Sequence, residues 1–90
     1  MDPESQVRRA DRARRLLEDE LVKEAREQIE RTLWETFKAS PLRDVEGREK
    51  LRLMQDVSDK FFGYLAAVVQ DGDMAKLELE DKKKGRWKIM

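Results

Sequence analysis

The side chains of this sequence that could carry chemistry are mainly carboxylates, because the chain contains no histidine and no cysteine. Glu20, Glu24 and Glu27 stand at helical spacing, and so do Asp56 and Asp59. Paired carboxylates can act as general acid and base or hold metal ions in a helical bundle, but a bundle di-metal site also needs Glu-x-x-His motifs. Since 20 of the 90 residues are acidic, chance explains these pairs. They predict a solvated helix face with basic partners one turn away.

Nucleophiles are few, and no histidine is present to activate them. The hydroxyl side chains are Ser5, Thr32, Thr36, Ser40 and Ser58. The four glycines stand singly, so no glycine-rich phosphate loop exists. We therefore expect a protein that is not an enzyme and has no cofactor, no metal site and no small-molecule substrate.

Composition excludes further classes of protein. A chain without cysteine has no disulfide framework and no zinc site of the Cys/His type. The longest apolar run, residues 64–69, is far too short for a membrane span or a secretory signal. We expect one small domain, residues 1–90, inside the cell and without a membrane partner.

The formal net charge is zero, with 20 basic and 20 acidic residues, but the charges are unevenly placed. Residues 1–15 hold five arginines and three acids, and residues 82–90 hold five basic residues and no acid. Residues 16–81 hold ten basic and seventeen acidic residues. The pattern predicts an acidic body with two basic ends.

The basic ends are the candidate contacts for nucleic acid or an acidic partner. They comprise Arg8, Arg9, Arg12, Lys82, Lys83, Lys84, Arg86 and Lys88, with Trp87 interleaved. Lysines and arginines with an aromatic residue can bind phosphates and stack on bases. Because the body is acidic and the net charge is zero, a solvated tail with Trp87 against its own hairpin is the favoured interpretation. Nucleic-acid binding stays the alternative.

The first predicted element is a helix over residues 3–39. Asp2 is a suitable cap and Pro3 a suitable first helical residue. No glycine or proline follows until Pro41. Apolar residues recur every four positions from Leu17 to Phe37 and form a broad stripe. A helix of this length, about 55 Å, is typical of a coiled coil or an extended hairpin arm.

A loop is predicted over residues 40–44 and a second helix over residues 45–70. The position before Pro41 disfavours helix, and Asp44 is the expected cap. A helix that starts at Ser40, with Pro41 as its first helical residue, is the alternative. Gly72 is expected to end the second helix in a left-handed conformation. Residues 73–84 then form either a short third helix, which we favour, or one strand of a β-hairpin that continues into the basic tail at residues 82–90.

The predicted fold is all-α: a long antiparallel αα-hairpin with a short C-terminal segment. We expect residues 3–14 to overhang the end of the second helix, and the C-terminal segment to fold back beside them. The side chains expected to pack inside the hairpin are Leu21, Ile29, Leu33, Phe37, Met54, Phe61 and Leu65.

Leu16, Trp34 and Trp87 are the candidate residues of an outward protein interface. Trp34 lies well off the centre of the apolar stripe and near Leu16 in angle, five turns away. This placement is equally typical of the margin of a wide core and of a second apolar face for another chain. So small and charged a chain needs a source of stability besides its own core. Since it has no disulfides and no metal site, we expect a partner chain to supply it. A homo-oligomer or a larger assembly is therefore expected.

The run from Ser40 to Leu51, with residues 10–21 upstream and residues 69–75 downstream, resembles a class of small helical proteins of tailed bacteriophages and prophages. The resemblance covers residues 10–80 and carries no catalytic or binding residues. It implies a phage origin, a setting in the host cytoplasm or the virion, and a role in virion structure or assembly. A host-directed inhibitor that acts by occlusion is the further alternative.

Overall fold

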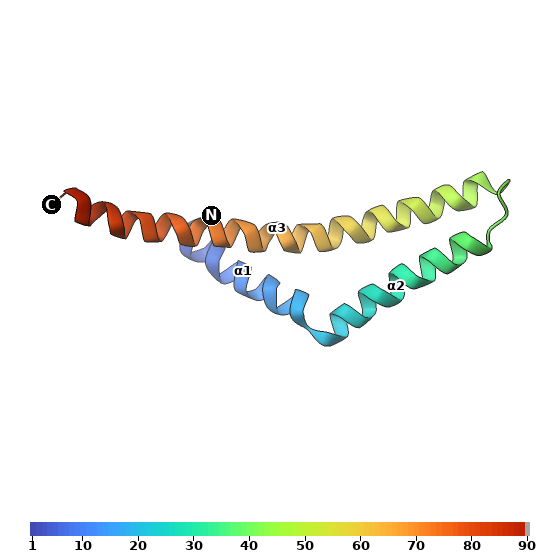
Figure 1. The fold of residues 1–90 in the computed structure, drawn as a ribbon, viewed down its shortest axis with the longest axis horizontal. Coiled ribbons are helices and arrows are strands. Elements are labelled where there is room, and N and C mark those ends of the chain that lie inside the picture. Colours follow the sequence, from blue (N-terminus) through green and yellow to red (C-terminus); the bar gives the residue numbers. More distant parts are fainter. Residues whose placement is uncertain (90) are drawn as a thin grey trace.

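The computed structural model describes the backbone of residues 1–89 and the side chains of residues 1–83. Every regular element of this part is a helix: α1 (Pro3–Glu18), α2 (Glu20–Ala39) and α3 (Val45–Ile89). The molecule measures 71 × 25 × 18 Å. α3 forms one long side of a flat triangle, and α1 and α2 form the other two sides (Figure 1). The predicted all-α, hairpin-like fold is confirmed.

The predicted helix starts are confirmed in their details. Asp2 caps α1 by accepting a hydrogen bond from the backbone N–H of Ser5 at 2.7 Å, and Pro3 is the first helical residue. Asp44 caps α3 by accepting from the backbone N–H of Gly47 at 3.0 Å. α2 ends at Ala39, so the loop occupies residues 40–44 as predicted.

The prediction of one helix over residues 3–39 is wrong, because the chain bends at Asp19. The Asp19 side chain accepts hydrogen bonds from the backbone N–H groups of Leu21, at 2.9 Å, and Val22, at 3.1 Å. Its own backbone is extended, with φ −63° and ψ 127°. An aspartate that caps the next turn competes with continued helix, and it does so here without glycine or proline. We call residues 16–21 the elbow.

The prediction that Gly72 ends a helix is also wrong. α3 runs through this position to Ile89, and no described glycine has a positive φ. Gly72 is instead buried against Ala10 of α1. Residues 73–84 are therefore a continuation of α3, and the β-hairpin alternative is excluded.

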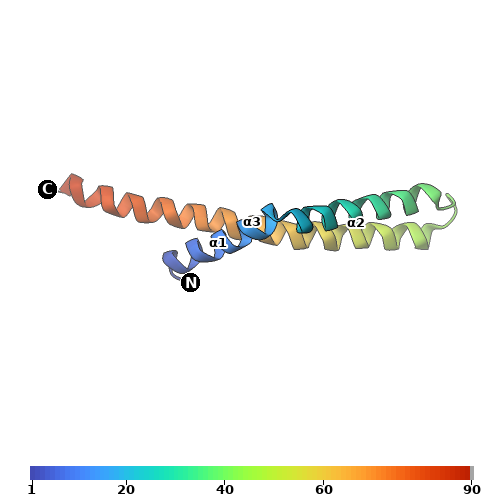
Figure 2. The ribbon, with the colours of Figure 1, turned by 90° about the horizontal axis from the view of Figure 1, so that it is seen from below.

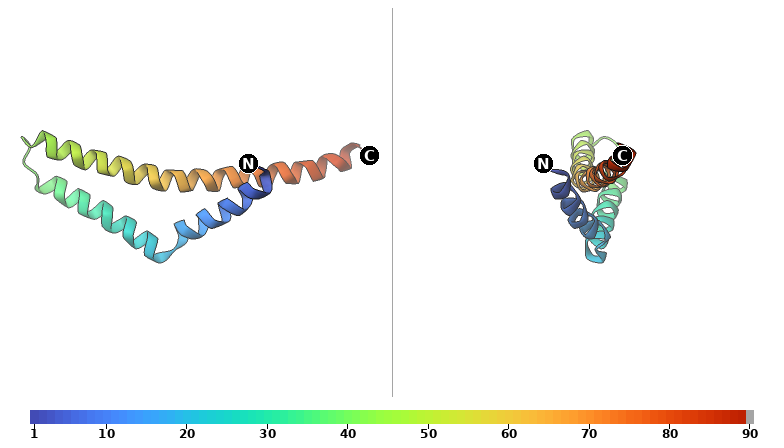
Figure 3. Two further views of the ribbon diagram at one scale, coloured as in Figure 1. Left: turned by 180° about the vertical axis from the view of Figure 1, so that it is seen from behind. Right: turned by 90° about the vertical axis from the view of Figure 1, so that its left-hand side faces the viewer.

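The core is the crossing of α1 over the C-terminal half of α3 (Figure 2). The buried apolar side chains are Ala10, Ala13, Phe62, Val68 and Ala75. The N-terminal segment therefore packs on α3 and does not overhang, which corrects that expectation. The overhanging segment is the C-terminal end of α3, which extends past the start of α1 and does not fold back (Figure 3).

The packing expected between the two arms of the hairpin, which are α2 and the first part of α3, is mostly absent. None of the α2 side chains is buried. Leu33, Phe37 and Leu65 are half-buried as part of the hairpin. Leu21, Ile29, Met54 and Phe61 are exposed, so their assignment to the hairpin interior is wrong. The elbow is the cause, because it directs α2 away from the face of α3 that carries Met54 and Phe61.

Candidate functional site

An exposed apolar strip runs along the middle of α3. It consists of Met54, Val57, Phe61 and Tyr64, which are each more than half exposed, and we call it the outer seam. The spacing of three, four and three residues is that of a coiled-coil seam. Such a strip on a surface of high overall charge is a candidate interaction site.

The neighbouring face of α3 is the one that α2 covers. Each inward residue of α3 follows an outer-seam residue by one position, or about 100° around the helix. Phe62, which follows Phe61, is one of these inward residues, and the guanidinium of Arg26 on α2 lies 4.5 Å from the centroid of its ring. The same face carries Gln55 and Ser58, and the Ser58 hydroxyl is buried without a hydrogen-bond partner. α2 therefore lies on a partly polar face, while the more apolar outer seam stays uncovered except at Tyr64, whose hydroxyl accepts a hydrogen bond from Arg9 of α1.

The outer seam continues beneath α1. Val68 and Ala75 follow Tyr64 at the same heptad spacing, and both are buried by α1. One stripe of α3 thus has a helix across its C-terminal part and none across its central part. The covered part shows that this stripe is suited to helix packing.

The exposed area of the molecule is large for its mass. The accessible surface is 7689 Å². A compact monomer of 10.7 kDa exposes about 5,500 Å². The difference, roughly 2,200 Å² per chain, exceeds the ~800 Å² that each partner contributes to a standard protein interface.

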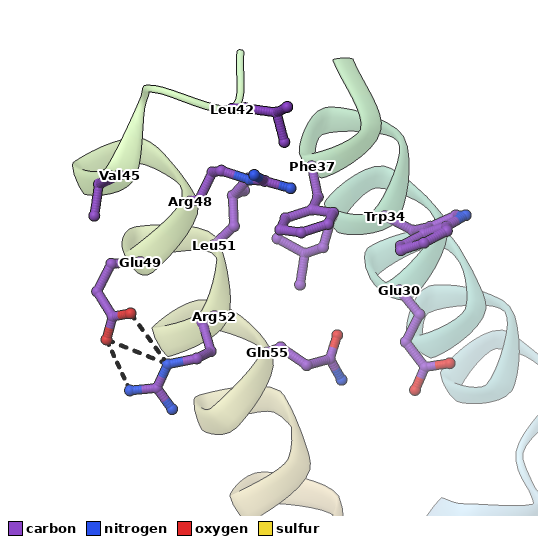
Figure 4. A pocket seen from close by; sticks show the side chains of 11 residues that line it. Glu30, Trp34, Phe37, Leu42, Val45, Arg48, Glu49, Leu51, Arg52 and Gln55 are labelled. Carbon is purple, nitrogen blue, oxygen red and sulfur yellow. Dashed lines mark hydrogen bonds and ion pairs between the residues drawn. The ribbon is translucent and has the colours of Figure 1, made fainter. Parts of the chain in front are cut away.

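A second candidate surface is a groove of about 640 Å³ between α2 and α3 near the loop. Figure 4 shows its side chains, and we call it the tip groove. Its apolar lining residues are Leu33, Trp34, Phe37, Leu42, Val45 and Leu51. Its polar lining residues are Glu30, Arg48, Glu49, Arg52 and Gln55. Trp34 stacks on Phe37 with the ring centroids 5.9 Å apart.

The charged residues of the tip groove are paired, with one exception. Glu30 accepts from Arg26 at 3.3 Å. Glu49 accepts from Arg52 at 2.7 Å, and this hydrogen bond lowers the pKa of Glu49 and raises that of Arg52. Within the part of the chain that the structure describes, no carboxylate lies within ion-pair distance of Arg48.

Arg48 is held over an aromatic ring instead. Its guanidinium lies 4.2 Å from the Phe37 ring centroid, and its Nε is buried without a hydrogen-bond partner. A cation on an aromatic face keeps its edge available to an acceptor. The groove therefore offers an apolar floor beside an uncompensated guanidinium, an arrangement that sequence reasoning missed because it depends on the pairing of α2 with α3.

The predicted interface residues differ in their placement. Leu16 and Trp34 are both exposed, at 49% and 57%, but they belong to different helices, α1 and α2, which the bend at Asp19 separates. The prediction that they lie along one edge of a single helix is therefore wrong. The side chain of Trp87 lies outside the described residues.

The basic residues of the two predicted basic ends are spread along the molecule. Arg9 reaches toward the middle of α3 and donates to the Tyr64 hydroxyl at 3.1 Å, while Arg8 donates to Ser5. Arg12 is exposed, as are Lys82 and Lys83 on the overhanging end of α3. The side chains of Lys84, Arg86 and Lys88 lie outside the described residues.

No group of three or more potential metal-binding side chains occurs among the described residues. None of the described helices carries an apolar stretch that could cross a membrane. Comparison with protein-family models, with curated proteins and with solved structures gives no match for this chain. The resemblance to small phage proteins therefore stays a prediction.

Proposed function

We propose that this chain is a non-enzymatic interaction protein that self-associates by burying the outer seam of α3 against a second copy. The observation that carries the proposal is the uncovered stretch of a stripe that α1 already uses for packing. Burying a large apolar side chain contributes about 1.5–3 kcal/mol. Four such residues at heptad spacing supply a driving force that the small core of the monomer lacks.

A second copy is a suitable partner because the outer seam is self-complementary in chemistry. Homo-oligomers most often form by matching one patch with its own copy across a twofold axis. The surplus of exposed area is large enough for such an interface on every chain. The resemblance to small helical proteins of tailed phages extends the proposal to a structural or assembly role in the host cytoplasm or the virion.

The test is solution mass by light scattering after size exclusion, for the natural chain and two variants. Phe61→Lys places a charge in the outer seam. Leu77→Lys is the matched control, because Leu77 is similarly exposed (56% against 61%) but lies about 160° around α3 from Phe61. We expect the natural chain and Leu77→Lys to self-associate to the same mass, and Phe61→Lys to have a lower mass. A natural chain that stays monomeric, or equal effects of both variants, would refute the proposal.

A further inference from the structure

The tip groove and the elbow have complementary chemistry that the outer seam does not use. We propose that the tip groove binds the elbow of a second copy of this chain, so that copies join head to tail. The inference rests on the proposed function insofar as the partner is again the same chain. The contact between the tip groove and the elbow is a second contact between copies, different from that of the outer seam.

The groove supplies an apolar floor and, in Arg48, one cation without a carboxylate partner among the described residues. Phe37 and Leu51 form the floor between the two helices, and Leu42 stands at the rim, 83% exposed (Figure 4). Arg48 extends across this floor toward Phe37 with no carboxylate partner among the described residues. An occupant that fits must bring an exposed aliphatic side chain and a carboxylate close together.

The elbow presents both groups. Leu16 is 49% exposed and Leu21 is 71% exposed, on either side of three consecutive acids. The Asp19 carboxylate is engaged by the backbone of α2, and Glu20 lies 3.8 Å from Lys23. Glu18 has no ion-pair partner within the described part of the chain. We therefore assign Glu18 as the carboxylate that meets Arg48.

A chain cannot place its own elbow in its own groove. α2 separates the two sites and is a helix of 20 residues, or about 30 Å. The contact must therefore join two chains through different surfaces. Each added copy leaves one elbow and one groove free at the ends of the row until a ring closes. The contact therefore produces a ring or an open filament. The outer seam would join such rows in pairs.

The experiment uses sedimentation velocity over a range of concentrations with charge-exchange variants of the full chain. Arg48→Glu and Glu18→Arg each place like charges in the proposed contact, and the double variant restores opposite charges. Arg43→Glu is the matched control, because Arg43 lies in the loop but does not line the groove. Circular dichroism of each variant verifies that the helices are retained.

We expect the natural chain and Arg43→Glu to grow beyond the dimer with concentration. Each single variant should stop at the dimer, and the double variant should recover growth. A natural chain that never exceeds a dimer, or single variants that grow as the natural chain does, would overturn the inference but not the proposed function. Growth that survives Phe61→Lys and is lost in Arg48→Glu would support the head-to-tail contact, and an Arg48→Glu variant that is monomeric and not dimeric would refute the outer seam.

Discussion

Gly72 of α3 lies directly against Ala10 of α1, with no room for a side chain between the two helices. A Cβ atom on Gly72 would overlap the Ala10 Cβ and would lie 2.9 Å from the Gln6 carbonyl oxygen. Small residues on both helices let their backbones approach closely at the crossing. The core of this molecule therefore depends on the absence of one methyl group.

Gly72→Ala should consequently destabilise the chain, although alanine is the better helix former. Overpacking costs about 1–3 kcal/mol, whereas the gain in helix propensity is about 0.5–1 kcal/mol. We expect a net loss of about 1 kcal/mol or more in the free energy of unfolding, because the overlap is with a short side chain and the backbone of α1. Urea unfolding followed by circular dichroism measures it.

Gly63→Ala is the control for this substitution. Gly63 lies in the same helix and has no atom within 4 Å of an added Cβ. The substitution should therefore stabilise the chain by about 0.5–1 kcal/mol through helix propensity alone. Equal stabilisation by both substitutions would mean that α1 does not cross α3 at Gly72.

The sequence was sufficient for the features that depend on a few neighbouring residues. Asp2 with Pro3 and Asp44 before Val45 mark helix starts through local hydrogen bonds, and both are found. The loop follows from Pro41 in the same way. Helix class and the hairpin were predictable because apolar periodicity and short loops act locally.

The features that were not predicted depend on contacts between distant residues or on competition between local structures. Gly72 has the sequence context of a helix end, but packing of Ala10 against it maintains the helix. Asp19 lies within a run of good helix formers, and its capping of α2 competes with continuation of the helix through this position. The elbow then decides which face of α3 meets α2, so the exposure of Phe61 and the unpaired Arg48 could not be inferred from periodicity.

The start of α1 should loosen in acid. The hydrogen bond from the Ser5 backbone N–H holds the pKa of Asp2 below its ordinary value. Because the pKa is lower in the folded state, its stabilising contribution is complete above the unfolded pKa and is lost as pH falls through the folded pKa. NMR titration of the Ser5 amide should follow this protonation. Asp2→Asn, which caps without titrating, should remove the pH dependence, and an unchanged Ser5 titration in that variant would contradict the assignment.

α2 should exchange its amide hydrogens faster than the crossing of α1 and α3. It has no buried side chain, and it faces the polar residues Gln55 and Ser58 of α3. Local opening costs least where few apolar contacts are lost. Hydrogen exchange followed by mass spectrometry should show residues 20–39 losing protection before residues 62–75. Equal protection of the two segments would show that α2 is packed more closely than this arrangement allows.

Asp19→Ala should lower the stability of the chain by about 1 kcal/mol, the usual effect of removing a helix cap. The substitution deletes the acceptor for the backbone N–H groups of Leu21 and Val22. Asp19→Asn should be nearly neutral, since asparagine caps as well as aspartate. Thermal unfolding of the two variants at low concentration separates the cap from self-association.

The opposite result for Asp19→Ala would carry a structural meaning. No glycine or proline interrupts residues 4–40, so without the cap the helix can continue through the elbow. A straight helix would lay α2 along the outer seam, in line with the stripe that α1 already covers. A more stable and monomeric Asp19→Ala variant would thus show that the Asp19 cap keeps Met54 and Phe61 exposed, and that self-association depends on this single carboxylate.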